Sequence, residues 1–135
     1  MTNLPKHILI VDDEEEIRRL LRTTLTKHGY RVTDVASGLE ARQVVATDRP
    51  TLIICDLQLQ ESDGLVLLRD LRRVLPGVPT ILLTGVLFDA KVAASTLGDA
   101  VTAYVPKPAK LSRIVEVTRR LLGDAAPEGI PAQGT

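Results

Sequence analysis

The chain has 135 residues, which suits one domain with a sizeable core, and its 17 basic and 17 acidic side chains give a net charge of +0 at pH 7. This balance argues against a mainly electrostatic partner such as bulk nucleic acid or an anionic membrane. No apolar stretch approaches the roughly 18 residues that span a bilayer, the first six residues are no signal peptide, and the only cysteine, Cys55, cannot form an internal disulfide, so we expect a cytoplasmic protein.

Five short apolar runs, most of them rich in Ile, Val and Leu, mark the predicted strands. In chain order they are His7–Val11, Arg31–Ala36, Leu52–Cys55, Thr80–Leu83 and Ala103–Val105. Most show little strict alternation of apolar and polar residues, which is typical of strands covered on both faces in a parallel sheet.

Helical patterns follow each of these runs. The first begins among Glu14–Glu16 and ends at Gly29, because acidic residues suit a helix N-terminus and glycine suits its end. The second helix contains Leu39 and Val44–Val45, and the third contains Leu65–Leu75 and ends before Pro76-Gly77. The fourth covers about Asp89 to Leu97, and the fifth contains Leu111–Leu122 and ends at Gly123. Their apolar residues recur at spacings of three and four.

The alternation of strand and helix, five times over, predicts an α/β fold: a doubly wound (βα)5 unit with a five-stranded parallel sheet and helices on both faces. Residues 1–5 would be an N-terminal extension, residues 6–123 the domain, and residues 124–135, which contain Pro and Gly without a pattern, a disordered tail or linker stub. In such folds the binding site lies at the carboxyl ends of the strands.

Polar residues follow four of the predicted strands. They are Asp12 and Asp13 after the first, Asp56 after the third, Thr84 after the fourth and Lys107 after the fifth. Three close carboxylates stay ionised together only beside a cation, and hard oxygen ligands without His or Cys suit Mg²⁺. A carboxylate can also act as a nucleophile and take a phosphoryl group. Together these residues predict a magnesium-dependent phosphate acceptor.

This set of residues resembles the receiver domain of bacterial response regulators in two-component systems, over about Lys6 to Gly123. The segments that carry the resemblance are His7–Glu14, Leu52–Leu57, Asp63-Gly64, Leu82–Gly85 and Tyr104–Pro108. The resemblance implies a flavodoxin-like sheet with strand order 2-1-3-4-5. The chain departs from the family at Gln60, where Pro is common, at Gly85, where Ala is common, and at Ala100, where Gly is usual.

The resemblance also implies a role for each residue of the site. Asp56 matches the phosphoacceptor, Asp13 the carboxylate that binds Mg²⁺ directly, Asp12 its neighbour that acts through water, and the backbone carbonyl of Gln58 a further metal ligand. Thr84 and Lys107 match the residues that hold the phosphoryl group. Thr84 and Tyr104 match the switch pair, and the peptide bond between Lys107 and Pro108 is expected to be cis, which is uncommon but allowed before proline.

The expected partners are a sensor histidine kinase or a histidine phosphotransfer protein, and a downstream protein that the sequence does not name. Phosphorylation would change the surface of the fourth helix, fifth strand and fifth helix, for protein–protein output, a phosphorelay or a phosphorylation-dependent dimer. We expect no direct contact with nucleic acid or membrane. The chain is either stand-alone, like the chemotaxis regulators of this family, or a piece of a longer regulator.

Several other functions compete with this interpretation. A haloacid dehalogenase-type phosphatase would need an acid where Gln58 stands, and amide side chains are not general acids. A nucleotide-binding domain would need a glycine-rich loop in place of Asp12-Asp13-Glu14. A DNA-binding regulator would need an output domain. A receiver that only binds a partner, without phosphorylation, ranks second.

Each residue also has a plain structural interpretation. Asp12 and Asp13 alone could cap a helix, and Tyr104 could be packing. His7 and His28 have no third ligand at metal spacing, and Cys55 is expected to be a small buried residue. The Arg18-Arg19 and Arg119-Arg120 pairs are expected to be solvated helix faces.

Overall fold

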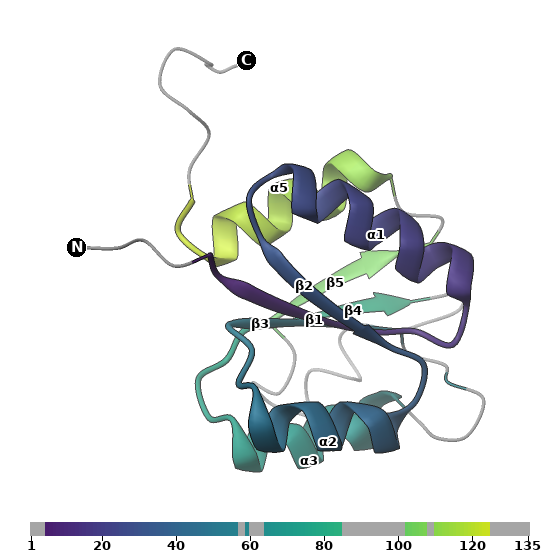
Figure 1. Ribbon diagram of the computed structural model, residues 1–135, viewed down its shortest axis with the longest axis vertical. Coiled ribbons are helices and arrows are strands. Elements are labelled where there is room, and N and C mark those ends of the chain that lie inside the picture. The colour runs from purple at the N-terminus through teal and green to yellow at the C-terminus, as the bar shows by residue number, and fades with distance from the viewer. Residues whose placement is uncertain (1–4, 57–58, 60–63, 85–101, 108–109, 125–135) are drawn as a thin grey trace.

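The computed structural model describes residues 5–56, 59, 64–84, 102–107 and 110–124, and these residues form a parallel α/β fold (Figure 1). The strands are β1 (His7–Val11), β2 (Arg31–Val35), β3 (Leu52–Asp56), β4 (Thr80–Thr84) and β5 (Ala103–Pro106). The helices are α1 (Glu15–Lys27), α2 (Gly38–Thr47), α3 (Gly64–Val74) and α5 (Leu111–Leu121). The helix expected at about Asp89 to Leu97 lies outside the described residues.

All strand pairs are parallel, and the strand order is β2-β1-β3-β4-β5. The predicted fold class and strand order are therefore confirmed. Strand ends differ from the prediction by one residue. β2 stops at Val35, whereas β3, β4 and β5 each extend one residue further, so Asp56 and Thr84 are the last residues of their strands and not the first residues of loops.

The strands are apolar on both faces because each face has its own helices. Figure 1 shows α1 and α5 on one side of the sheet and α2 and α3 on the other. Along β1, Ile8 and Ile10 pack with residues of α1 and α5, whereas Leu9 and Val11 pack with residues of α2 and α3. This explains why the sequence of these strands showed so little alternation.

Alternate residues at the carboxyl ends of the strands follow the same two faces. Asp12 continues the face of Ile8 and Ile10, and Asp56 continues the face of Leu52 and Ile54, toward α1 and α5. Lys107 continues the face of Val105 in the same way. Residues from three strands therefore project from one face at one edge of the sheet.

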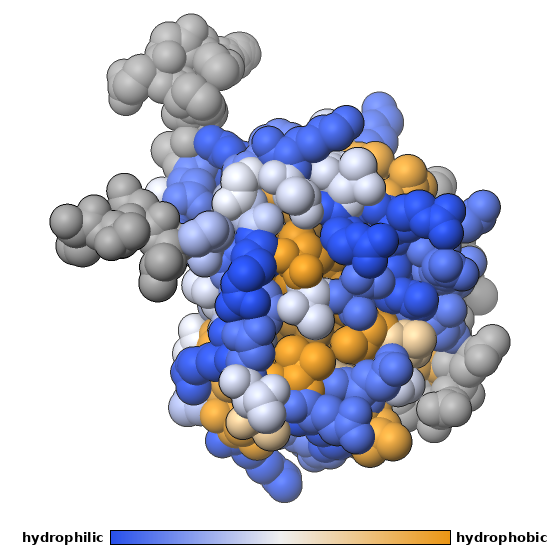
Figure 2. Space-filling model, in the orientation of Figure 1, coloured by the Kyte–Doolittle hydropathy of each residue, from blue (hydrophilic) through white to orange (hydrophobic). Residues whose placement is uncertain are grey.

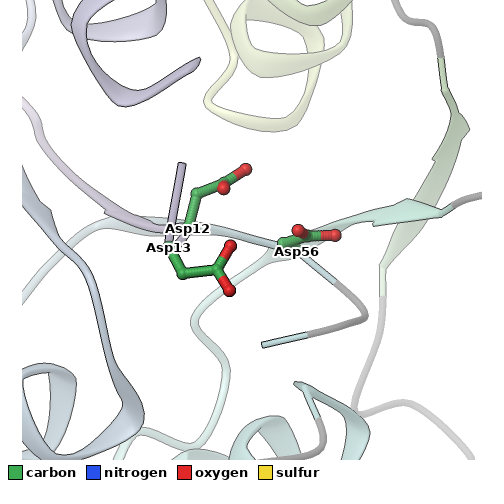
Figure 3. A group of neighbouring side chains, drawn as sticks. All are labelled: Asp12, Asp13 and Asp56. Carbon is green, nitrogen blue, oxygen red and sulfur yellow. The ribbon is translucent and has the colours of Figure 1, made fainter. Parts of the chain in front are cut away.

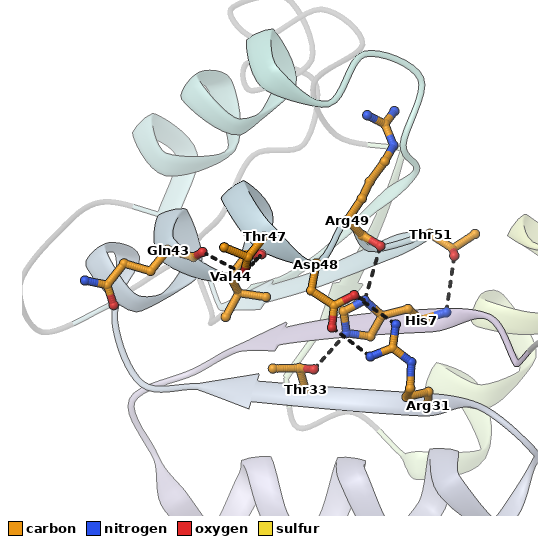
Figure 4. A network of polar contacts seen from close by, with 9 residues as sticks. All are labelled: His7, Arg31, Thr33, Gln43, Val44, Thr47, Asp48, Arg49 and Thr51. Atoms are coloured by element: carbon orange, nitrogen blue, oxygen red, sulfur yellow. Dashed lines mark hydrogen bonds and ion pairs between the residues drawn. The ribbon is translucent and has the colours of Figure 1, made fainter.

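At the amino ends of the strands, opposite the acidic residues, a polar network surrounds His7 at the start of β1 (Figure 4). The buried His7 ring lies 2.7 Å from the Thr33 hydroxyl and 3.2 Å from the Arg49 carbonyl, and its backbone N–H donates to the Thr51 hydroxyl. Arg31 donates twice to the carboxylate of Asp48. These contacts join β1 and β2 to the segment between α2 and β3, so His7 is structural, as expected.

The face shown in Figure 2 is largely hydrophilic, and apolar residues are visible on it between the helices and the sheet. A few large apolar side chains are exposed on the helices, namely Leu20, Leu39, Val66 and Val74. No helix of the described residues is long and apolar enough to cross a membrane.

Candidate functional site

Three carboxylates meet at the carboxyl edge of the sheet. Asp12 and Asp13 follow β1 and Asp56 ends β3, and Figure 3 shows their side chains gathered in one place. One carboxylate oxygen of each lies within 4.8 Å of the others. Because β1 and β3 are hydrogen-bonded neighbours, the fold brings these residues together although they are far apart in the sequence.

Lys107 supplies a positive charge to this acidic cluster. Its Nζ lies 3.0 Å from Oδ2 of Asp56 and 3.9 Å from a carboxylate oxygen of Glu14. Burial by itself would lower the pKa of Lys107, but the neighbouring Asp56, Asp12 and Glu14 outweigh burial and raise that pKa. The ammonium group therefore stays charged and points at the carboxylate that the sequence marked as the acceptor.

Asp12 is fully buried beside other carboxylates, and both conditions disfavour its ionised form. Burial is the largest cause that raises its pKa to about 6, and the nearby carboxylates of Asp56 and Glu14 raise it further. A hydrogen bond from the backbone N–H of Glu14 to Asp12 Oδ1, at 2.8 Å, and the charge of Lys107 oppose this change. The charged form of Asp12 is thus costly until a cation lies nearby.

The residues present fit a divalent cation of the magnesium type. Asp12 Oδ2 is buried and accepts no hydrogen bond from the described part of the chain. The cluster offers oxygen donors alone, and Lys107 provides one positive charge against three carboxylates. Hard oxygen ligands in this arrangement suit Mg²⁺, which also accepts phosphate oxygens.

Thr84 and Lys107 are joined through their backbones. The backbone N–H of Lys107 donates to the carbonyl of Thr84 at 2.6 Å, and Thr84 is buried at the end of β4. Tyr104 pairs with Leu82 in the sheet and packs half-buried against the core on the side of α2 and α3. Burial raises the pKa of Tyr104. Thr84 therefore ends the strand beside the one that carries Tyr104.

Two expected features of the site lie outside the described residues. One is the backbone carbonyl of Gln58, and the other is the peptide bond between Lys107 and Pro108.

Two further residues contribute to the site although neither was predicted from the sequence. Glu14 faces Lys107, and its place directly after Asp12-Asp13 was the available signal.

The second missed contributor is Arg18, which was expected on a solvated helix face together with Arg19. Arg19 is exposed, as expected, and pairs with Glu15. Arg18 is only 16% exposed and donates to the carbonyl oxygen of Asp12 at 2.7 Å. The prediction was wrong for Arg18 because the helical pattern shows which way a residue faces and not which loop its long side chain reaches.

Comparison with known proteins decides the family. The family model described as the response regulator receiver domain matches residues 8–119. The chain belongs to the response regulator receiver family. The receiver domain is a signalling domain, and the matched segment contains the acidic cluster, Thr84 and Lys107.

Individual relatives agree with this assignment. Over 129 residues the chain is 36% identical to transcriptional regulatory protein GlrR of Escherichia coli K12, covering 94% of this chain and 28% of GlrR. Response regulator MprA of Mycolicibacterium vanbaalenii is 33% identical over 125 residues, covering 93% of this chain and 54% of MprA. The chain thus spans about a quarter to a half of these curated relatives.

Solved receiver structures share the fold. The receiver domain of NtrX from Brucella abortus is 29% identical, with a TM-score of 0.78 that covers 87% of this chain and 99% of that one. The chemotaxis response regulator CheY4 of Vibrio cholerae, at 24% identity and a TM-score of 0.77, is similar in fold.

Proposed function

We propose that this receiver domain is a switch that is turned on when Asp56 accepts a phosphoryl group from a phosphohistidine, in a histidine kinase or a histidine phosphotransfer protein. The observation that carries the proposal is the placement of Lys107 Nζ 3.0 Å from Asp56, beside the carboxylates of Asp12 and Asp13. A carboxylate nucleophile at the edge of the sheet with an ammonium held beside it suits phosphoryl transfer, which depends on positioning and charge neutralisation.

In the proposed reaction a carboxylate oxygen of Asp56 attacks the phosphorus of the phosphohistidine. The new P–O bond forms as the P–N bond breaks, and the electron pair of that bond leaves with the imidazole, which takes up a proton. Lys107 holds one phosphoryl oxygen by charge and hydrogen bonding, and the hydroxyl of Thr84 holds another. The chain assists only its own phosphorylation and dephosphorylation, and it is no enzyme toward other substrates.

Magnesium would be held by Asp13, by Asp12 through water, by Asp56 and by the backbone carbonyl of Gln58. When bound, it would neutralise the carboxylates and the phosphoryl oxygens. Two observations support this assignment: Oδ2 of Asp12 accepts no hydrogen bond from the described residues, and the pKa of Asp12 is raised. A bound cation would remove the cost of keeping Asp12 charged.

The switch would pass from Thr84 to Tyr104. When Thr84 turns toward the phosphoryl group, Tyr104 gains room to turn inward, and the surface of the fourth helix, β5 and α5 changes its partners. A cis peptide bond between Lys107 and Pro108 would aim the lysine at the site. The change is a shift between two populated states of one fold.

The output of the switch would be protein–protein: binding of a downstream protein, transfer of the phosphoryl group in a relay, or a dimer through this same surface. We propose that it acts in the cytoplasm without direct contact with nucleic acid or membrane. The balanced charge of the chain supports that proposal.

The test is the intact mass of the chain after incubation with Mg²⁺ and either acetyl phosphate or phosphoramidate, whose P–N bond imitates that of phosphohistidine. We expect one phosphoryl group per chain, lost again in mild base, and none on Asp56→Asn. Asp70→Asn is the matched control, because Asp70 is a half-exposed carboxylate on α3 that pairs with Arg42 and is not part of the cluster. A parent chain that takes no phosphoryl group from either donor, or an equal adduct on Asp56→Asn, would contradict the proposal.

A further inference from the structure

The guanidinium of Arg18 bridges two parts of the chain that flank the acidic cluster. Arg18 lies on α1, one turn after the helix begins. Its Nη1 donates to the carbonyl oxygen of Asp12 at 2.7 Å, and its Nε donates to Oδ2 of Asp34 on β2 at 3.0 Å. Arg18 and Asp34 are 16% and 14% exposed, so this pair is shielded from most of the solvent.

Asp34 is itself held on two sides. Its Oδ1 accepts a hydrogen bond from Nη1 of Arg22, one turn further along α1, at 2.6 Å. Its position on β2 pairs with Ile10 on β1, two residues before Asp12. Asp34 is therefore a rigid acceptor that fixes where the guanidinium of Arg18 lies.

The peptide groups around Asp12 are held from both directions. The backbone N–H of Asp12 donates to the carbonyl of Val35 at 3.1 Å, and its carbonyl accepts from Arg18. That carbonyl belongs to the peptide bond between Asp12 and Asp13. Fixing this bond fixes the directions from which the two carboxylates leave the backbone.

Without such support the carboxylates of Asp12, Asp13 and Asp56 would move apart, because like charges repel. The described residues keep their oxygens within 4.8 Å of one another. A group that orients cation ligands without touching the cation raises affinity by reducing the rearrangement that binding requires.

We propose that Arg18, anchored by Asp34, is a positioning residue that holds the Asp12–Asp13 peptide so that the acidic cluster is preorganised for a divalent cation. The inference rests on the proposed function of the cluster. Lysine is a poor replacement, because one ammonium cannot reproduce the planar two-point contact of Nε and Nη1.

The experiment measures Mg²⁺ binding to the full chain by titration calorimetry, without any phosphodonor. Arg18→Met replaces the aliphatic part of the side chain with an apolar chain and removes the guanidinium that makes the contact. We expect its Kd for Mg²⁺ to rise about ten-fold, as is typical when a residue supporting metal ligands is lost, and we expect a smaller rise for Arg18→Lys. Arg19→Met is the matched control, since it removes the same charge from the neighbouring, exposed position and should bind Mg²⁺ like the parent.

A second measurement separates positioning from general loss of structure. The initial rate of phosphorylation by acetyl phosphate is followed against Mg²⁺ concentration. A positioning role predicts that Arg18→Met needs about ten times more Mg²⁺ for half its maximal rate but approaches the parent rate at saturation. A damaged site would lower the saturated rate instead.

Each outcome has one meaning. Equal Mg²⁺ affinity in folded Arg18→Met and the parent overturns the inference, and so does an equal weakening in Arg19→Met, which would indicate bulk charge. If Arg18→Met does not fold, Asp34→Asn is decisive: it leaves Arg18 in place without its charged anchor and should also weaken Mg²⁺ binding. A parent that binds no Mg²⁺ contradicts the proposed function itself, before any variant is compared.

Discussion

The most informative single residue is Asp12, because the features that suit it to a cation work against the stability of the cation-free chain. It is fully buried, crowded by other carboxylates, and has a pKa raised to about 6 by burial first of all. At neutral pH it is nevertheless mostly ionised. The folded chain therefore bears a cost that the unfolded chain does not.

We predict that Asp12→Asn stabilises the cation-free chain at pH 7. The difference between the ordinary pKa of 3.8 and a value of about 6 bounds the gain, and we expect about 1–3 kcal/mol. The amide oxygen can still accept the hydrogen bond from the N–H of Glu14. Urea unfolding in the presence of a chelator measures the gain.

Saturating Mg²⁺ should reverse the order of the two proteins, because only the parent keeps the full set of carboxylates. Asp70→Asn serves as the comparison and should change the free energy of unfolding equally with and without Mg²⁺. A loss of stability in Asp12→Asn without Mg²⁺ would show that burial of the charge is not costly.

At this scale the sequence indicated the site well. Asp12, Asp13, Asp56 and Lys107 were predicted to meet because each follows a strand, and the structure brings their side chains together. Arg18 was not predicted. Its contact depends on the reach of a long side chain to a backbone carbonyl, and the sequence pattern carries no signal for that.

Among the elements, α2 shows how a weak pattern can still define a helix. Its hydrophobic face is modest, but Ser37 caps its N-terminus: the hydroxyl accepts from the N–H of Glu40 at 3.2 Å. The carboxylate of Glu40 reaches back to the N–H of Ala36 at 2.7 Å. Serine followed three residues later by glutamate is the signal of a capping box, so the start of this helix was readable from the sequence.

We predict that Ser37→Ala lowers the free energy of unfolding by about 1 kcal/mol, since the N–H of Glu40 loses its acceptor. Denaturant titration followed by circular dichroism measures the loss. Ser112→Ala is the matched control: Ser112 is exposed inside α5, and its removal should change stability by less than about 0.5 kcal/mol. Equal effects at the two serines would mean that the cap contributes nothing.

The strands were predictable as elements because the helices on both faces keep them apolar. The ends of the strands were harder to predict. Asp56 and Thr84 still pair with neighbouring strands, at Leu83 and Pro106, although both are polar. A polar residue at the site edge interrupts the apolar run before the backbone pairing ends, so hydrophobicity alone places the strand end one residue early.

For the whole molecule, alternation of strands and helices predicted a parallel sheet, whereas the order β2-β1-β3-β4-β5 came from the resemblance to receiver domains. Hydrophobic periodicity tells which residues are buried and not which strand lies beside which. The contacts that hold the two ends of the domain together cannot be predicted from hydrophobic periodicity either. Lys6, before β1, donates to the carbonyl of Leu122 at 2.6 Å and to Asp124 at 2.9 Å, so it ties the two ends of the fold together.

Tyr30, just before β2, completes this closure by donating its hydroxyl to Oδ2 of Asp124 at 2.9 Å. Burial first, and then the carboxylate of Asp124, raise the pKa of Tyr30 from 10.0 to about 12. The neutral phenol is therefore the form that the folded chain prefers. Its contribution to stability is complete below pH 10 and is lost as the pH rises toward 12, because the unfolded chain ionises first.

We predict that Tyr30→Phe is less stable than the parent at pH 8, by about 1–2 kcal/mol, because the hydrogen bond to the charged Asp124 is lost. This deficit should shrink by about 1.4 kcal/mol at pH 11, where only the parent bears the cost of keeping its phenol protonated. Urea unfolding at both pH values measures the change, with Asp70→Asn as a variant whose difference from the parent should not depend on pH. A constant deficit for Tyr30→Phe would mean that burial and Asp124 do not hold the phenol neutral in the folded chain, although its hydroxyl still stabilises the fold.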